Sequence, residues 1–221
     1  MRYPNFREEK KLWRRRYKYV VGLDEAGRGP LAGPVVACAL CLKICLGPIS
    51  TDFKEIRDSK QLSPKKREEI YNILVNHSDI RWGIGRVSEK IVDKINILEA
   101  TKLAMRKAVK NLEKKFQKGL LQNLSDRTNF ATSSFLLIDG NFSIDSDIPQ
   151  KSIIKGDQKV FSCAAASIIA KVCRDRIMVK YHKKYPQYAF NKHKGYGTKK
   201  HKDMIEMYGL CGIHRKTFKT A

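Results

Sequence analysis

The segment from Tyr19 to Leu40, YVVGLDEAGRGPLAGPVVACAL, restricts the possible folds more than any other part of the chain. Two apolar runs rich in β-branched residues, 18–24 and 33–43, flank a short stretch of glycine and proline. This pattern predicts two buried strands joined as a hairpin. The first run ends on two adjacent carboxylates, Asp24 and Glu25. Any function assigned to the chain must therefore explain why two acids lie at the end of a buried strand.

The rest of the chain alternates helical and strand patterns, which predicts an α/β protein with a mixed sheet. Ser63 before Pro64 predicts one helix start, Asn96 with Glu99 predicts a second, and Thr198 predicts a last helix that ends at Gly209. We interpret the polar residues 117–134 as a surface excursion. We further expect strands at 80–87, 135–140 and 152–157, and a long helix over 158–185 that Pro186 ends.

The chain carries 45 Lys and Arg against 22 Asp and Glu among its 221 residues, a formal net charge of +23. The excess gathers in three clusters, residues 10–18, 114–118 and 180–202, and the last one interleaves Tyr, Phe and His with Lys. That mixture suits phosphate contacts combined with stacking on sugars or bases. Charge therefore favours a nucleic-acid partner over an acidic protein or a membrane surface.

Other features exclude several classes. The apolar runs are far shorter than the roughly 20 residues that a membrane span needs, and the charged N-terminus is unlike a secretory signal, so we expect a cytoplasmic protein. The six cysteines lack zinc-like spacing, and we interpret those in apolar runs as core residues. GRGPLAG does not match a nucleotide-binding glycine motif. For the five histidines we expect surface or phosphate-contacting roles.

Four acids lie where the chain changes direction: Asp24, Glu25, Asp139 and Asp157. Singly, each has an ordinary structural explanation, such as a helix N-cap for Asp157 or a turn pair for Asp139 with Gly140. Gathered in a basic protein, however, they would repel one another unless a cation neutralised them. Hard oxygen ligands select Mg²⁺ or Mn²⁺, and pairs of these ions support in-line displacement at phosphodiesters. Together the patterns indicate a metal-dependent nuclease.

Seven stretches match one family in order and spacing, and the match extends from about Val20 to Phe218. The chain resembles the type 2 ribonucleases H, in particular bacterial ribonuclease HII. The resemblance implies a ribonuclease H-like fold, with a central mixed β-sheet flanked by helices and a C-terminal helical segment. The stretches that carry it are GLDEAGRGPLAGPVVA, DSKQLSPKKRE, INILEATKLAMRKAV, LLIDGN, KGDQKVFSCAAASIIAKVCRD, HKGYGTKKH and GIHRKTF.

The resemblance also implies an activity and a set of site residues. The enzyme would hydrolyse the RNA strand of RNA/DNA hybrids and cleave 5′ to single ribonucleotides in duplex DNA, as in ribonucleotide excision and primer removal. Catalysis by two Mg²⁺ or Mn²⁺ ions would leave a 3′-hydroxyl and a 5′-phosphate. The implied residues are the metal ligands Asp24, Glu25, Asp139 and Asp157, the ribose-sensing Gly27, Arg28, Gly29 and Tyr196, and Ser59 and Lys60 near the phosphates.

From the same match we expect a basic N-terminal extension over residues 1–17, a catalytic domain over 18–178 and a C-terminal helical substrate-binding segment over 179–221. We expect a monomer. Two alternatives remain: a nucleic-acid-binding module without catalysis, and a nuclease or resolvase of the same fold that acts on DNA alone. The complete set of four acids argues against the first, and Arg28 with Tyr196 argues against the second if both sense ribose.

Overall fold

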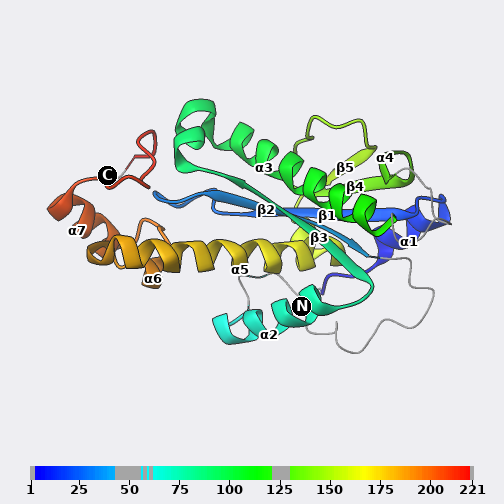
Figure 1. Cartoon of the computed structure of the whole chain (residues 1–221), viewed down its shortest axis with the longest axis horizontal. Coiled ribbons are helices and arrows are strands. Elements are labelled where there is room, and N and C mark those ends of the chain that lie inside the picture. The colour runs from blue at the N-terminus through cyan, green and yellow to red at the C-terminus, as the bar shows by residue number, and fades with distance from the viewer. Residues whose placement is uncertain (1–2, 43–55, 57–58, 60–61, 121–129, 220–221) are drawn as a thin grey trace.

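The computed structural model describes residues 3–42, 56, 59, 62–120 and 130–219. A five-stranded sheet with the order β3-β2-β1-β4-β5 lies between helices on its two faces (Figure 1). The strands β1, β2 and β3 pair antiparallel, whereas β4 and β5 continue the sheet parallel to β1, so the predicted mixed α/β sheet is confirmed. The strands are β1 (Tyr19–Ala26), β2 (Val35–Leu42), β3 (Ile80–Val87), β4 (Ser134–Asp139) and β5 (Gln150–Ile153).

Helix α3 covers one face of the sheet, and α5 covers the other and extends past the sheet toward α6 and α7 (Figure 1). The described residues include no helix that is both long and apolar enough to cross a membrane. The helices are α1 (Arg7–Arg14), α2 (Pro64–Asn76), α3 (Glu89–Leu120), α4 (Phe130–Ser133), α5 (Phe161–Lys184), α6 (Phe190–His193) and α7 (Lys199–Tyr208), with 3-10 turns η3 (Gly156–Gln158) and η4 (Pro186–Tyr188).

The predicted helix starts are confirmed by their caps. The Ser63 hydroxyl accepts the Lys66 N–H at 3.2 Å, and the Thr198 hydroxyl accepts the His201 N–H at 3.3 Å. Asn96 has a non-helical φ of 65° and caps the longer part of α3 by accepting backbone N–H groups of the next turn. Side-chain acceptors at these positions satisfy N–H groups that a helix start leaves unpaired.

Strand β1 is the centre of the structure. It pairs with β2 on one side and β4 on the other, and α5 approaches its backbone at Gly22. A Cβ atom added at Gly22 would lie 2.2 Å from the Ser162 carbonyl carbon. The fully buried alanines 164–166 follow on the same helix. Small residues on both elements therefore let the helix backbone pack directly against the strand.

The basic N-terminal stretch contains α1, which docks through buried Leu12, while Phe6 stacks on Phe161 at 4.2 Å. Two other expectations need correction. Asp157 does not cap α5, because it lies in η3 and α5 starts only at Phe161, with Val160 in extended conformation at the N-cap position. Strand β5 accordingly ends at Ile153 rather than continuing to residue 157.

The expected polar excursion at 117–134 falls partly outside the described residues, which omit 121–129. Its first residues continue α3, and its last residues form α4 and begin β4. Phe130 is buried there and packs against the Tyr19 and Phe116 rings, at centroid distances of 5.6 and 5.0 Å. The end of this segment is therefore held to the core by an aromatic cluster.

The contact at Gly22 predicts a stability difference between two alanine substitutions. Gly22→Ala should destabilise the protein by about 2–4 kcal/mol, because two backbones must move apart to admit the methyl group. Gly29→Ala is the matched control: an added Cβ there meets nothing within 4 Å, so its effect should stay within about 0.5 kcal/mol. Thermal and urea unfolding measure both, and equal effects would contradict the close packing of α5 on β1.

Candidate active site

Three of the four predicted acids come together at one end of the sheet. Asp24 lies on β1, Asp139 ends β4 and Asp157 lies in η3, and one carboxylate oxygen from each is within 4.8 Å of the other two. The parallel pairing of β1 with β4 places the ends of these strands side by side. The Gly156 N–H donates to Asp139 Oδ1 at 2.7 Å and holds η3 against β4.

Glu25 is outside this group of three but, like Asp24 and Asp139, lines a cavity at this end of the sheet. Its side chain is 11% exposed, and Arg28 Nη1 lies 3.5 Å from its Oε1. The Glu25 N–H donates to Asp24 Oδ1 at 2.7 Å, which orients the neighbouring carboxylate. The structure thus brings three acids together and places the fourth beside them on the wall of the cavity.

The electrostatics of the site favour a bound cation. Asp24 is only 5% exposed. Burial raises the pKa of Asp24 well above its usual range, the nearby Glu25 and Asp139 raise it further, and a hydrogen bond with Ser167 opposes them. A cation that binds here would neutralise this repulsion, and the donor set consists of carboxylate oxygens, which suit Mg²⁺ and Mn²⁺.

A cavity of about 360 Å³ opens beside the acids, and it includes several of the residues predicted to contact substrate. Ser59 lines it and its hydroxyl lies 2.8 Å from that of Ser167, a link between two segments far apart in sequence. Lys171 also lines it, paired with Asp175 at 2.8 Å. Lys60 is outside the described residues. The other predicted residues on the cavity wall are Gly27, Arg28, Gly29 and Tyr196.

The two glycines beside Arg28 serve different purposes. Gly27 has a φ of 102°, and an added Cβ would lie 2.2 Å from Arg174 Nε, so the fold itself requires glycine there. Gly29 has ordinary backbone geometry and open space where a Cβ would project. The packing of the protein does not explain that glycine, whereas a ligand that approaches the backbone in the cavity would.

Two arginines that the sequence analysis did not single out hold the loop in place. Arg174 and Arg215 are 0% and 1% exposed, and both donate to backbone carbonyl groups of the loop after β1. Arg174 binds the carbonyls of Pro34, Ala32 and Lys194 at 3.0–3.1 Å, and Arg215 binds those of Gly27, Arg28 and Gly33 at 2.6–3.0 Å. The sequence could have indicated that Arg174 is buried, because helical spacing places it on the same face as Ala170 and Met178, which are both buried.

Tyr196 reaches the cavity from the C-terminal segment. The residue is 41% exposed, and its ring centre lies 5.5 Å from Lys171 Nζ and 5.8 Å from the Arg174 guanidinium. The Leu31 N–H donates to the Gly195 carbonyl at 2.8 Å, which joins the Tyr196 loop directly to the loop after β1. The predicted ribose-sensing residues, although about 170 residues apart in sequence, therefore share one wall.

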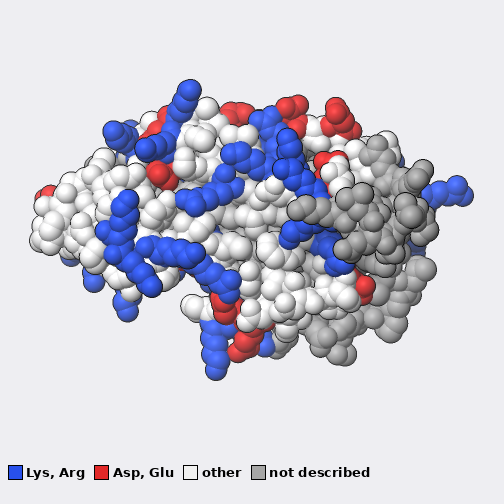
Figure 2. Space-filling view, in the orientation of Figure 1, with Lys and Arg blue, Asp and Glu red and all other residues white. Residues whose placement is uncertain are grey.

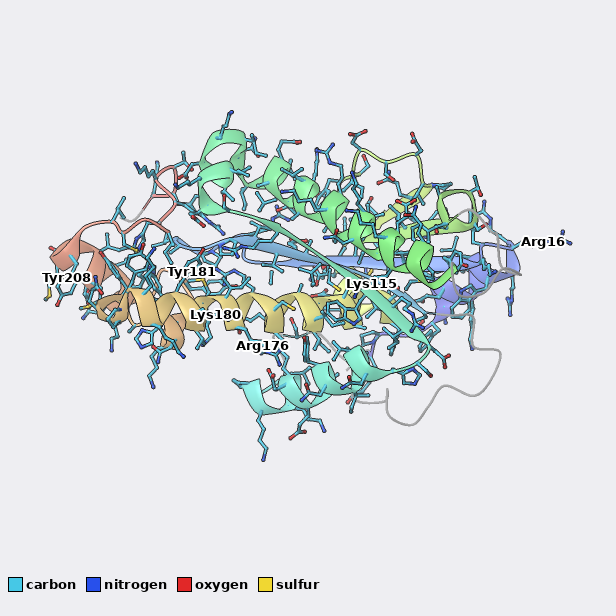
Figure 3. The ribbon with its side chains drawn as sticks, in the orientation of Figure 1. Arg16, Lys115, Arg176, Lys180, Tyr181 and Tyr208 are labelled. Atoms are coloured by element: carbon cyan, nitrogen blue, oxygen red, sulfur yellow. The ribbon has the colours of Figure 1, made fainter. Side chains whose placement is uncertain are left out.

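Basic side chains spread over the face formed by α3, β3 and α5 (Figure 2). They include Lys115 and Lys180, which belong to two of the predicted clusters, and Arg176 (Figure 3). The histidines differ from expectation. His201 and His214 are 0% and 4% exposed, so surface roles are wrong for these two, because aromatic rings of the C-terminal segment enclose them.

The carbonyl contacts of Arg215 predict that lysine cannot replace it. Arg215→Lys keeps the charge but loses the planar fork, which leaves several buried carbonyls without a donor and should cost about 2–4 kcal/mol. The control Arg16→Lys changes an exposed side chain that projects into solvent (Figure 3) and should cost less than about 0.5 kcal/mol. Urea unfolding gives both values, and a tolerated Arg215→Lys would contradict the structural role.

Comparison with known proteins agrees with this geometry. The family model described as Ribonuclease HII matches residues 21–221. The Ribonuclease HII of Desulfotalea psychrophila is 45% identical over 215 residues, covering 97% of this chain and 87% of that protein. That of Fusobacterium nucleatum is 49% identical over 204 residues, covering 91% and 86%.

Solved structures share the fold. The ribonuclease H2 of Pyrococcus horikoshii OT3 superposes with a TM-score of 0.68 and 28% identity, covering 92% of this chain and 95% of that one. The ribonuclease HII in a complex with PCNA from Archaeoglobus fulgidus has the same fold, with a TM-score of 0.64, 20% identity and coverage of 91% and 95%. Motifs, fold and relatives agree that this chain belongs to the ribonuclease HII family of endoribonucleases.

Proposed function

We propose that this endoribonuclease acts on RNA/DNA hybrids and also cuts duplex DNA on the 5′ side of a single ribonucleotide, leaving a 3′-hydroxyl and a 5′-phosphate. One observation carries the proposal: the acids Asp24 and Asp139 border the same cavity as Gly29 and Tyr196. A phosphate bound at the acids and the adjacent sugar at the loop after β1 would then contact the protein in the same cavity. The 2′-hydroxyl is the group that distinguishes RNA from DNA at such a site.

Ribonucleases of this family depend on divalent metal. We propose that Asp24, Glu25, Asp139 and Asp157 hold two Mg²⁺ or Mn²⁺ ions. Bound there, such ions supply a water of lowered pKa and stabilise charge on the oxygens of an in-line phosphodiester displacement. The protein orients the carboxylates through the Gly156 N–H at Asp139 and the Ser167 hydroxyl at Asp24.

Recognition of ribose would come from the loop after β1 and from the C-terminal segment 179–221. The space beside Gly29 lets main-chain groups approach a 2′-hydroxyl. The Tyr196 ring, at the edge of the same cavity, would pack against the sugar. Ser59 lies where it could support the adjacent phosphate, and we assign Lys60 the same role on sequence alone. The surrounding basic residues would contribute affinity through counterion release.

One experiment separates this function from its alternatives. The protein is incubated with three duplexes, carrying one ribonucleotide, a full RNA/DNA hybrid or DNA only, with Mg²⁺, Mn²⁺ or a chelator. Cleavage of the first two with either metal, and none of the third, supports the proposal. Binding without cleavage would indicate a non-catalytic module, and cutting of the all-DNA duplex would indicate a DNA nuclease.

The position of Asp139 predicts a variant that folds but does not cleave. Asp139→Asn keeps an oxygen that can accept the Gly156 N–H, yet it removes the charge needed to hold a cation, so cleavage should fall by about 10³-fold or more while duplex binding persists. Asp145→Asn is the control, because its carboxylate is 88% exposed and pairs only with Arg106 among the described ion pairs. Near-normal turnover of Asp139→Asn would remove Asp139 from the metal site.

Tyr196 should matter most for the single-ribonucleotide duplex, because a long hybrid offers many alternative registers. We expect Tyr196→Ala to lower cleavage of the single-ribonucleotide substrate by about 10- to 10³-fold, with a smaller loss on the hybrid. Tyr208→Ala, which removes another exposed tyrosine of the same segment (Figure 3), should leave the ratio of the two rates unchanged. Equal losses on both substrates, or a lower melting temperature that accounts for them, would contradict the sensing role.

A further inference from the structure

Two buried histidines lie behind Tyr196 and have no part in the chemistry proposed above. His201 belongs to α7 and His214 to the segment that follows it, and their Nε2 atoms are 3.1 Å apart. Side chains this buried need partners for their polar atoms. One of these partners is the backbone carbonyl of Tyr196. The histidine pair therefore bears on the function proposed for that residue.

The hydrogen bonds fix where the protons lie. The Cys211 N–H donates to His214 Nδ1 at 2.8 Å, so the proton of His214 is on Nε2. That Nε2–H faces His201 Nε2, which must therefore accept, and the proton of His201 is on Nδ1. His201 Nδ1 lies 2.9 Å from the Tyr196 carbonyl oxygen and donates to it. The two neutral rings thus form a chain of hydrogen bonds, here called the relay, in which each donor points away from Cys211 and toward Tyr196.

The surroundings keep both rings neutral. Burial lowers the pKa of His201 to about 4 and also lowers that of His214. The His193 ring stacks on His201 at 4.3 Å, and its own nitrogens are engaged by the Gly195 N–H and the Tyr188 carbonyl. Phe190 packs edge-on against His201 at 5.4 Å. A second proton on either relay ring would set two N–H groups against each other.

We propose that His201 and His214 are positioning residues, which hold the Tyr196 carbonyl through this neutral relay and so fix the tyrosine ring at the cavity. The inference rests on the proposed role of Tyr196. The relay supports only one side of the site: Asp24 and Asp139 belong to β1 and β4. Its loss should therefore affect selectivity for the single ribonucleotide more than metal-dependent cleavage in general.

The proton assignment can be tested without substrate or metal. In ¹⁵N-labelled protein at neutral pH, long-range imidazole spectra should show His201 protonated at Nδ1 and His214 protonated at Nε2. These opposite tautomers are the signature of the relay. The same tautomer in both rings, or a charged ring in either, would overturn it.

Two substitutions at His214 test the link to Tyr196. The His214→Gln amide can still donate to His201 Nε2, whereas His214→Phe fills the space without a donor. We expect His214→Phe to lower the ratio of single-ribonucleotide to hybrid cleavage to the level of Tyr196→Ala, and His214→Gln to stay within about threefold of the parent ratio. His77→Phe, at a half-buried histidine that follows α2 outside both the relay and segment 179–221, controls for the added ring.

The outcomes separate the inference from the proposed function. If Tyr196→Ala lowers the ratio of single-ribonucleotide to hybrid cleavage and His214→Phe leaves it unchanged, the positioning role is overturned. A ratio that Tyr196→Ala itself leaves unchanged would refute the sensing role of Tyr196, and the spectra would still decide whether the relay exists. Melting temperatures are measured for every variant, and if His214→Phe does not fold, a large loss of ratio in His214→Gln would contradict the inference.

Discussion

The direct packing of α5 on β1 is the contact on which the rest of the structure depends. At Gly22 the helix and strand backbones meet, because neither element places a side chain between them. This contact fixes the start of α5, and with it η3 and Asp157, against the ends of β1 and β4. Further along, the same helix supplies Ser167 and Lys171 to the cavity and Arg174 to the loop after β1. The close contact of α5 with β1 thus sets the positions of the acids, of the cavity wall and of the arginine that holds the loop after β1.

The carboxylates make this alignment costly when no cation is bound. Asp24 is buried near Glu25 and Asp139, and both the burial and the neighbouring charges disfavour its ionised form. The fold holds the acids together through rigid elements and through backbone donors such as the Gly156 N–H. Such concentrations of like charge are typical of functional sites, where stability is traded for activity. A bound cation would return part of that stability by mass action.

Backbone carbonyls connect the two halves of the site. Arg174 and Arg215 bring buried positive charge to the loop after β1, and six hydrogen bonds from them satisfy its carbonyl groups. Arg174 also binds the Lys194 carbonyl, next to the Tyr196 loop. Because guanidinium is planar and offers several donors, a single side chain can hold two loops in a fixed relation. The geometry proposed for ribose recognition is thereby set from inside the protein.

Local patterns in the sequence were sufficient for the hairpin, for the helix starts at Ser63, Asn96 and Thr198, and for the mixed sheet. Short-range caps and apolar periodicity depend on neighbours along the chain, so the sequence alone determines them. The four acids could be selected because each follows a predicted element end. Long motifs then identified the family.

Only the tertiary structure decided which groups are buried and what they contact. The docking of α1, the carbonyl contacts of Arg174 and Arg215, and the pairing of His201 with His214 join segments far apart in sequence. The clustering of Asp24, Asp139 and Asp157 within 4.8 Å likewise follows from the parallel pairing of β1 with β4 and from the Gly156 N–H bond that holds η3 against β4. A buried arginine or histidine has the same letter as an exposed one, and its role depends on the partners that folding brings to it.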